Sequence, residues 1–353
     1  MKPPKQPPSE QTVLITGGTG SFGKTMVMHL LDQGYKQIRI FSRDEWKQED
    51  LRVRMAEPRL KFYIGDVRSR PSVDAAMEGV DLVFHAAALK QVPSCEFFPM
   101  QAVETNVVGS NNVIESAVSH GVECLVVLGT DKAVYPVNAM GMTKAVMEKV
   151  AQSVARRLGE STTGVTRVCS VRYGNVMYSR GSVIPLFVRQ IREGKPITVT
   201  SKEMSRFMMP LADSVRLVEF AFQNAKQGDI FVKKAAACTI GMLAQALLEL
   251  FESDAPINVI GLRHGEKMFE ALATCAEVQR AEDMGDFLRI PMDERDLNYN
   301  RFFTEGDGSE NQLQDYDSHS TTQLTLDEVK NLLLQLPEIQ QDLVDAGITP
   351  AVA

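Results

Sequence analysis

Acidic and basic side chains stand close together in the middle of the chain, in the stretch TDKAVYPVNAMGMTK. Asp131 and Lys132 are neighbours, directly after Thr130, and an acid beside a base suits an elimination, which needs one proton removed and another delivered. Lys144 lies four residues after Met140, so the two share one face of the helix that the next residues predict. Methionine carries no titratable proton, so position 140 itself offers neither an acid nor a base.

The first half of the chain supplies the frame for these residues. Short apolar runs alternate with helical patterns, and the predicted strands cover residues 12–16, 37–42, 61–66, 81–87, 124–129 and 167–173. Such alternation predicts an α/β fold with a Rossmann-like, doubly wound parallel sheet. Ligands bind outside the carboxyl ends of such strands, and Thr130 follows the fifth one.

After residue 174 the alternation weakens, which predicts a smaller C-terminal α/β domain and an extended polar C-terminal segment. The expected parts are a disordered leader, a Rossmann domain to which segments around 207–240 return, a second domain, and an extended segment with a terminal helix. Their limits are residues 1–11, 12–173, 174–292 and 293–353. Thr325 and Glu328 form a capping-box pattern at the start of that helix.

A glycine-rich turn, TGGTGSFG, directly follows the first strand and opens a helix. Its glycines permit a tight turn and let the backbone approach a pyrophosphate at the helix N-terminus. The cofactor-binding residues expected here and at the next strand ends are Gly17, Thr19, Gly20, Ser21, Phe22, Gly23, Ser42, Arg43, Asp66, Val67, Ala86, Ala87, Ala88, Lys144 and Tyr173. Arg43 after the second strand favours NADP over NAD, although Asp44 and Glu45 leave NAD open. His85 is interpreted as a structural histidine.

The composition of the chain narrows the classes of protein to which it can belong. The net charge of −7 argues against general nucleic-acid binding, and no apolar run reaches transmembrane length. The five cysteines are scattered without a CxxC pair, which favours reduced thiols in a cytoplasmic protein and no metal site.

Longer motifs give a resemblance to a known family. The chain is similar to the extended short-chain dehydrogenase/reductases, and within them resembles the nucleotide-sugar 4,6-dehydratases of capsule and surface-polysaccharide synthesis. UDP-N-acetylglucosamine 4,6-dehydratases that invert C5 are the most similar in motif. The motifs that carry this are TGGTGSFG, IFSRDE, FYIGDVR, HAAALKQVPSCEFFP, TNVVGSNNV, TDKAVYPVNAMGMTK, RYGNV, SRGSVIPLF, SRFMM, RHGEK, EDMGD and RDLNY.

The resemblance implies that the smaller C-terminal α/β domain is a substrate-binding domain, in which residues 174–292 mainly bind the nucleotide sugar. It also implies a lyase reaction that consumes no cofactor overall. Hydride leaves C4 of the sugar for NADP⁺ and later returns to C6, while Lys132 removes the C5 proton and Asp131 protonates the departing C6 hydroxyl. The implied product is UDP-2-acetamido-2,6-dideoxy-β-L-arabino-hex-4-ulose, made from UDP-N-acetylglucosamine for capsule or O-antigen amino sugars. Asn106 matches the family's structural asparagine. The implied substrate-binding residues are Lys90, Asn175, Arg180, Val183, Arg206, Arg263 and Glu266.

Met140 replaces the superfamily's usual tyrosine and leaves alternatives open. In the first alternative, Lys132, Lys144 or a water that they hold with Thr130 deprotonates the 4-hydroxyl. In the second, Tyr135 does so. In the third, the chain is a catalytically dead NADP-binding sensor. The resemblance adds that this dehydratase branch also carries methionine here, so we predict activity. A configuration-retaining dehydratase and an epimerase are the nearer rivals. The family also implies a homo-oligomer, a dimer or a hexamer.

Overall fold

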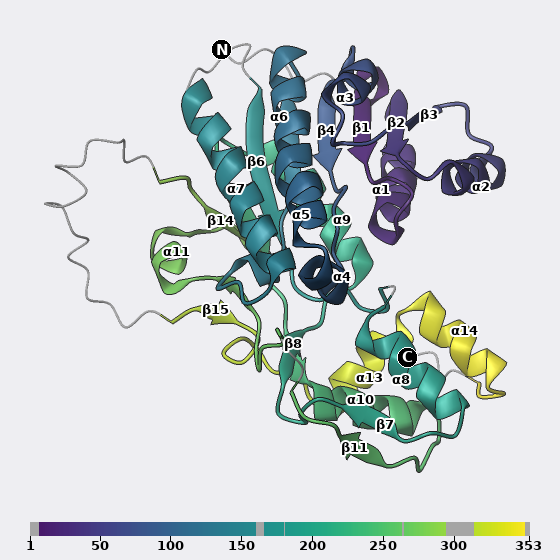
Figure 1. Cartoon of the computed structure of the whole chain (residues 1–353). Coiled ribbons are helices and arrows are strands. Elements are labelled where there is room, and N and C mark those ends of the chain that lie inside the picture. Colours follow the sequence, from purple (N-terminus) through teal and green to yellow (C-terminus); the bar gives the residue numbers. More distant parts are fainter. Residues whose placement is uncertain (1–6, 160–165, 180, 263–264, 294–313, 350–353) are drawn as a thin grey trace, which may run out of the picture.

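The structure is a computed structural model that describes residues 7–159, 166–179, 181–262, 265–293 and 314–349. A nine-stranded sheet forms the centre of the larger lobe (Figure 1). From edge to edge its strands are β13 (Glu282–Asp283), β14 (Phe287–Ile290), β9 (Ile230–Lys233), β6 (Arg167–Arg172), β5 (Cys124–Leu128), β4 (Leu82–His85), β1 (Thr12–Thr16), β2 (Gln37–Ser42) and β3 (Leu60–Ile64). All pairings from β9 to β3 are parallel, and β14 pairs antiparallel with β9 and β13. The predicted α/β fold with a Rossmann-like parallel sheet is confirmed.

Helices cover both faces of this sheet, which explains why its central strands are mostly apolar and buried on both faces. In β1, Val13 and Ile15 pack into one core with α1, α2 and α9, whereas Leu14 packs into the opposite core with α3, α6 and α7. The bounds of these helices are α1 (Ser21–Asp32), α2 (Glu45–Met55), α9 (Leu211–Asn224), α3 (Arg70–Met77), α6 (Gly109–Ser119) and α7 (Ala139–Leu158). No helix in the described parts of the chain is long and apolar enough to span a bilayer.

The strands of the sheet end close to the predicted positions, and the residues after them leave the sheet. β1 and β2 have the predicted bounds, but β4 ends at His85, two residues before the predicted end. The Thr16 hydroxyl accepts hydrogen bonds from the backbone N–H groups of Ala86 and Ala87, both at 3.2 Å. These residues therefore leave the sheet and turn toward the glycine loop.

A smaller lobe packs below the sheet (Figure 1) around a core of its own. Its elements are α8 (Val183–Arg192), β7 (Ile197–Val199), α10 (Ile240–Leu250), β11 (Ile257–Val259), α13 (Leu326–Leu334) and α14 (Pro337–Asp345). Two short antiparallel pairs lie beside this lobe, β8 (Ser205–Phe207) with β10 (Ala237–Thr239) and β12 (Ala271–Ala273) with β15 (Tyr316–Asp317).

The structure corrects the domain limits expected from the sequence. Within the expected leader 1–11, Pro8–Glu10 form a 3₁₀ helix, η1, whose Pro8 carbonyl accepts a hydrogen bond from Lys36 N–H at 3.0 Å. Residues 1–6 lie outside the described part. Within 174–292, β13 and β14 extend the large sheet, and within 293–353 both α13 and α14 complete the smaller core. These assignments depend on contacts between distant segments, which a local pattern does not reveal.

The last described segment runs along the small antiparallel pairs before it enters the smaller lobe (Figure 1). Ser318, which is fully buried, hydrogen bonds through its hydroxyl to Ser205 and to the backbone N–H of Glu270. The predicted capping box at Thr325 and Glu328 is present at the start of α13. A further helix, α14, was not predicted. It begins at Pro337, and proline is favoured at the first helical position.

Candidate active site

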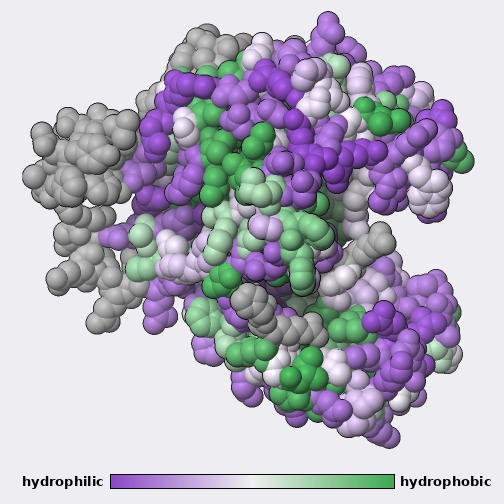
Figure 2. Space-filling view, in the orientation of Figure 1, coloured by the Kyte–Doolittle hydropathy of each residue, from purple (hydrophilic) through white to green (hydrophobic). Residues whose placement is uncertain are grey.

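A cavity of about 1110 Å³ opens at the carboxyl ends of the parallel strands. It extends from the glycine-rich turn after β1, past the end of β5, to the corner between α13 and α14. Figure 2 shows the surface hollowed between the two lobes, on the side where α2 and α14 lie. All of the predicted cofactor-binding residues line this cavity, from Gly17 to Tyr173.

The glycine turn leaves its backbone open toward the cavity. Gly17 has φ +74°, and a Cβ there would lie 2.9 Å from the backbone nitrogen of Ala87. A Cβ on Gly23 would lie 2.5 Å from the Cα of Gly18, so only glycine lets α1 approach the turn this closely. No side chain caps α1 at Gly20, which leaves the positive end of the helix available to an anion. This cradle therefore fits the pyrophosphate of a dinucleotide.

Charged side chains of both signs line the cavity just beyond the carboxyl ends of β2 and β3. The guanidinium of Arg43 lies 3.7 Å from the carboxylate of Asp66, and its side chain is 54% exposed. Asp44 caps α2 by accepting the Lys47 N–H at 3.0 Å and also pairs with the Lys47 ammonium. Asp44 is thus engaged in the helix cap, whereas Arg43 faces the cavity from an exposed position.

His85 is structural, as interpreted from the sequence. Its ring nitrogens lie 2.7 Å from the Thr16 hydroxyl and 2.8 Å from the Ser110 hydroxyl. Burial, together with the charge of Lys144, lowers the pKa of His85 to about 3. The imidazole is therefore neutral and holds the end of β4 in place.

Beyond β5 the chain forms a one-turn 3₁₀ helix, η3 (Asp131–Ala133), that presents the acid and the base together. The Thr130 hydroxyl donates to Asp131 Oδ1 at 2.8 Å, and the Lys132 ammonium donates to the same oxygen at 3.1 Å. Burial acts to lower the pKa of Lys132, but the carboxylates of Asp131 and Glu270 outweigh it, so the pKa is raised. Both residues of the predicted pair line the cavity.

Helix α7 holds η3 at close range. The Asn138 side chain caps α7 by accepting the Gly141 N–H at 2.8 Å. A Cβ on Gly141 would lie only 2.3 Å from the carbonyl oxygen of Lys132, so a glycine is needed where helix and turn meet. Met140 is 4% exposed, packs with Cys95 and still lines the cavity.

Lys144 lies one turn further along α7 and points back under β5. Its ammonium donates to the Leu128 carbonyl at 2.8 Å. Burial lowers the pKa of Lys144 to about 8, against the opposing attraction of Glu148. A lysine with this pKa exchanges protons near neutral pH, which a solvated lysine does not.

Asn106 supports the loop that follows β4. It lies on a π-helical turn, η2 (Val103–Val108), and its amide bonds both backbone groups of Leu89, accepting at 2.8 Å and donating at 2.9 Å. The same amide donates to the Thr143 hydroxyl at 3.0 Å. The asparagine therefore ties the loop to α7.

Tyr173 and Asn175 continue the cavity wall beyond β6. The Tyr173 ring stacks on Phe22 with centroids 5.7 Å apart, and burial with the nearby Asp131 raises the pKa of its hydroxyl. The buried Asn175 Oδ1 accepts no hydrogen bond from the described residues. An unpartnered buried amide oxygen is costly, so this atom marks a place for a ligand donor.

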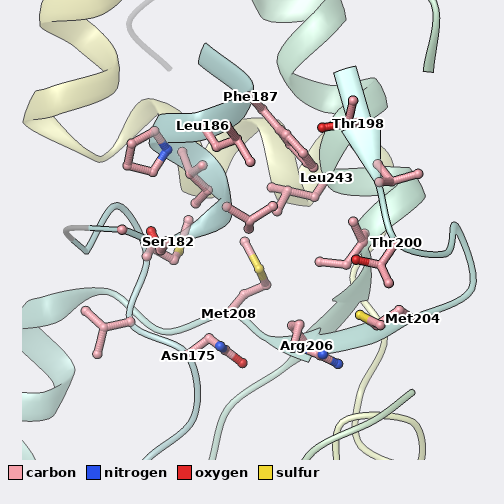
Figure 3. A pocket seen from close by; sticks show the side chains of 18 of the residues that line it. Asn175, Ser182, Leu186, Phe187, Thr198, Thr200, Met204, Arg206, Met208 and Leu243 are labelled. Carbon is pink, nitrogen blue, oxygen red and sulfur yellow. The ribbon is translucent and has the colours of Figure 1, made fainter. Parts of the chain in front are cut away.

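A second cavity of about 470 Å³ adjoins the first and lies in the smaller lobe. Figure 3 shows Asn175 and Arg206 on one side, with Leu186, Phe187 and Leu243 opposite and Met208 between them. The buried atoms Ser182 Oγ and Glu266 Oε2, both from its lining, accept or donate no hydrogen bond among the described residues. The cavity thus combines an apolar end with unpartnered polar groups, as a nucleotide site does.

The predicted substrate-binding residues fall into three groups. Asn175, Val183, Arg206 and Glu266 line the second cavity, and Lys90 lines the first. Arg206 is held by the Lys267 carbonyl, to which it donates at 2.9 Å. Arg180 and Arg263 lie outside the described residues.

Tyr135 does not point into the site. Its hydroxyl donates to Asp315 Oδ1 at 3.1 Å, its side chain is exposed, and its backbone has φ +49°. It does not line the large cavity in the described structure, whereas Lys144 does. The geometry therefore disfavours Tyr135 as a substitute for the absent tyrosine.

Sequence reasoning missed residues that approach the site from distant segments. Thr105 on η2 lines the cavity, and its buried hydroxyl has no hydrogen-bond partner in the described part of the chain. Glu270 pairs with Lys132 at 3.4 Å. The corner between α13 and α14 adds Gln335, Leu336, Pro337 and Glu338. Thr105 opens the motif TNVVGSNNV, but no motif or spacing signals Glu270 or the corner between α13 and α14.

Comparison with known proteins places the chain among sugar-modifying proteins. The family described as "Polysaccharide biosynthesis protein" matches residues 13–292, and the one described as "Polysaccharide biosynthesis protein C-terminal" matches residues 293–340. Proteins named UDP-glucose 4-epimerase from Rickettsia conorii and Rickettsia canadensis are each 54% identical over 341 residues, which covers 96% of this chain and 99% of theirs.

Solved structures agree with the fold. Pen from Bacillus thuringiensis is 36% identical with a TM-score of 0.83, over 94% of this chain and all of that one. DesIV, a dTDP-glucose 4,6-dehydratase from Streptomyces venezuelae solved with NAD bound, is 24% identical with a TM-score of 0.65, over 73% of this chain and 87% of that one. At that identity the DesIV likeness speaks for the fold alone.

Proposed function

This chain belongs to the polysaccharide biosynthesis protein family, and from that premise we propose that it is a UDP-N-acetylglucosamine 4,6-dehydratase that inverts C5. The observation that carries the proposal is the buried Asp131 carboxyl beside the Lys132 ammonium, 3.1 Å apart at the cavity wall. A 4,6-elimination needs an acid for the leaving hydroxyl and a base for C5, and these two groups supply both.

The proposed cofactor is NADP. Bound at this site, it would supply the hydride chemistry between C4 and C6, which leaves proton handling to the protein. The open turn at Gly17 and Gly23 fits the pyrophosphate, and Arg43 faces the place where a 2′-phosphate would need a cation. Lys144, buried under the end of β5, orients the nicotinamide end and is the proposed base for the 4-hydroxyl, because its pKa of about 8 allows a neutral amine.

The proposed place of the UDP group is the second cavity. Arg206 supplies positive charge for phosphate. Asn175 Oδ1 and Glu266 Oε2 are acceptors that have no hydrogen-bond partner in the described parts of the chain, and they suit ribose hydroxyls or the uracil N–H. The apolar side formed by Leu186, Phe187 and Leu243 suits a pyrimidine ring. This position sets the sugar at the junction of the two cavities, where Asn175 lines both.

A second candidate is a UDP-sugar 4-epimerase, favoured by the names of the relatives that are 54% identical. Epimerisation at C4 needs a base for the 4-hydroxyl and room for the keto sugar to turn. It needs no acid aimed at C6. The buried acid and base at Asp131 and Lys132 therefore support the dehydratase over the epimerase. A configuration-retaining dehydratase shares every group named here and differs only in the face from which C5 is reprotonated.

The test is incubation of the purified protein with UDP-N-acetylglucosamine and catalytic NADP⁺, followed by proton NMR. We expect a 4-keto-6-deoxy product whose coupling constant at H5 reports the L-arabino configuration. A product with the opposite H5 coupling indicates retention, and UDP-N-acetylgalactosamine indicates epimerisation. Bound cofactor with no product from any UDP-sugar would favour the sensor interpretation. Parallel reactions with NAD⁺ and with an Arg43→Ala variant test the cofactor preference.

A further inference from the structure

Ser182 directly precedes the first turn of α8 and lies on the wall of the second cavity (Figure 3). A serine at this position ordinarily caps its helix by accepting a hydrogen bond from a backbone N–H of the first turn. The Ser182 hydroxyl makes no such bond. Its Oγ is also buried, and it has no hydrogen-bond partner elsewhere among the described residues. A buried hydroxyl without a partner is costly, so this one marks a place for a group that the chain itself does not supply.

The turn before α8 fixes where this hydroxyl lies. Gly181 has φ +77°, which favours glycine, and the Ser182 N–H donates to the Ser179 carbonyl at 2.9 Å. A Cβ on Gly181 would lie 3.4 Å from the side-chain amide nitrogen of Gln91, which belongs to the loop after β4 and lines the large cavity. Ser182 therefore lies where the smaller lobe meets the larger one.

The linings of the two cavities separate three regions. Arg206, the proposed phosphate contact, lines the second cavity alone, whereas Asp131 and Lys132 line the first alone. The described residues that line both cavities are Asn175, Val176, Met177, Gly181 and Ser182. Ser182 thus lies at the junction between the proposed UDP position and the acid–base pair, which is the proposed place of the sugar ring.

The chemistry of the sugar decides which substituent reaches this junction. In the proposed reaction C4, C5 and C6 face Lys144, Lys132 and Asp131, while C1 carries the diphosphate that extends toward Arg206. Of the ring carbons that take no part in the reaction, C2 is the one next to C1, so its substituent faces the junction on the UDP side. In UDP-N-acetylglucosamine this substituent is an acetamido group, which ends in one carbonyl oxygen and one methyl group.

The junction offers a partner for each part of an acetyl group. The Ser182 hydroxyl is a donor for the carbonyl oxygen, and Met177, which is 5% exposed, supplies with Val176 an apolar surface for the methyl group. We propose that Ser182 donates a hydrogen bond to the acetamido carbonyl and so selects N-acetylated sugars over UDP-glucose, whose 2-hydroxyl has neither the carbonyl nor the methyl group. This inference deepens the proposed function and rests on it.

The first test measures affinity by calorimetry for UDP, UDP-glucose and UDP-N-acetylglucosamine, with NADPH present so that no hydride can leave C4. Because UDP-glucose leaves the buried Ser182 hydroxyl without its partner, wild type should bind UDP-N-acetylglucosamine at least ~10-fold more tightly than UDP-glucose. Ser182→Ala should weaken UDP-N-acetylglucosamine about 3–10-fold, as expected for one neutral hydrogen bond, and the other two ligands less than about twofold. An equal loss for all three ligands would assign Ser182 to the UDP group, and no loss would leave it without a ligand; either result overturns the proposal.

The second test asks whether the same hydroxyl is needed by the fold. Since it does not cap α8, Ser182→Ala should leave the midpoint of urea unfolding unchanged or raise it. Thr325→Ala is the matched control, because Thr325 does cap α13, and it should lower the midpoint. If Ser182→Ala lowers the midpoint as much as Thr325→Ala does, the hydroxyl serves the helix and the proposal fails.

The two tests also separate this proposal from the assigned reaction, since neither requires turnover. If wild type makes no 4-keto sugar but Ser182→Ala loses affinity for UDP-N-acetylglucosamine alone, the reaction assignment fails while the acetamido site stands. If wild type dehydrates the sugar but Ser182→Ala shows no selective loss of affinity, the acetamido site fails while the reaction stands.

Discussion

At the scale of the residue, Met140 and Lys144 together describe how the site differs from one built around a tyrosine. Met140 contributes an apolar wall. The neighbouring Lys144 is buried, and among the described residues its hydrogen-bond partners are the Leu128 carbonyl and the Met147 sulfur. Burial lowers the pKa of Lys144 to about 8, so a sizeable share of this amine is neutral near pH 8. In the proposed mechanism, the proton-accepting task of the tyrosine therefore falls to Lys144, the lysine that would otherwise lower the pKa of that tyrosine.

The buried Lys144 should cost stability in the absence of ligand. The unfolded lysine binds its proton up to about pH 10.5 and the folded one only up to about pH 8, so the unfolded state holds more protons between these values. Stability therefore rises with pH from 8 to 10.5, and the penalty is complete below pH 8. One pKa unit is about 1.4 kcal/mol, so after the lost hydrogen bond Lys144→Met should gain about 1–3 kcal/mol at pH 7.

Urea unfolding of the wild type and of Lys144→Met at pH 7 and at pH 10 checks this prediction. The gain should shrink at the higher pH, and turnover should fall by ~10²–10⁴-fold at both. Lys149→Met, an exposed position on the same helix, is the matched control and should change neither quantity much. A loss of stability at pH 7 in Lys144→Met would contradict the argument.

At the scale of the element, the contact between η3 and α7 sets the position of the acid and the base. Because a Cβ at Gly141 would lie 2.3 Å from the Lys132 carbonyl, Gly141→Ala must push the turn away from the helix. A shift of about 1 Å at a reacting group costs ~10²-fold in rate, and overpacking costs about 1–3 kcal/mol. We expect both losses, measured as kcat and as the urea midpoint.

Ser153→Ala is the control for Gly141→Ala, since Ser153 lies on the exposed face of the same helix and gains similar helix propensity. Near-normal kcat in Gly141→Ala would mean that η3 can shift without harm, and it would contradict the role of this contact in positioning Asp131 and Lys132.

Elements with local signals were predictable, and those that depend on distant contacts were not. The strand 12–16 has an apolar centre, Val13 to Ile15, and the glycine turn directly follows the strand, so both were predictable from the sequence. Thr325 and Glu328, three residues apart, form the capping-box pattern that predicted the start of α13. By contrast, the Lys132–Glu270 pair and the cavity wall at Gln335 come from segments far apart in the chain, and no residue type or period in either segment points to the other.

At the scale of the whole molecule, the last described segment holds the smaller lobe together. Val329, Leu333, Ile339 and Leu343 are all buried in that lobe's core. Each buried aliphatic side chain contributes about 1.5–3 kcal/mol, so their sum is comparable with the net stability of a typical domain, about 5–15 kcal/mol. The lobe that contains the proposed UDP site should therefore not fold without α13 and α14.

A chain ending at Asp293 tests this dependence against one ending at Thr349, which keeps every described element. We expect the shorter chain to bind the dye ANS and to lose UDP affinity, measured by calorimetry, by at least ~10²-fold. The longer control should behave as the full chain does. A shorter chain with native UDP affinity would show that the smaller lobe is stable on its own.

The position of α13 and α14 in the chain also has a consequence for the order of events during synthesis. A ribosome makes these helices after all other described elements, and domains generally fold as their residues emerge, N-terminal part first. The parallel sheet from β3 to β6 can pair while the smaller lobe still lacks the core residues that α13 and α14 supply. Ser318, which braces Glu270, also emerges late. A nascent chain can thus form the proposed cofactor cradle before it has a complete Lys132 site.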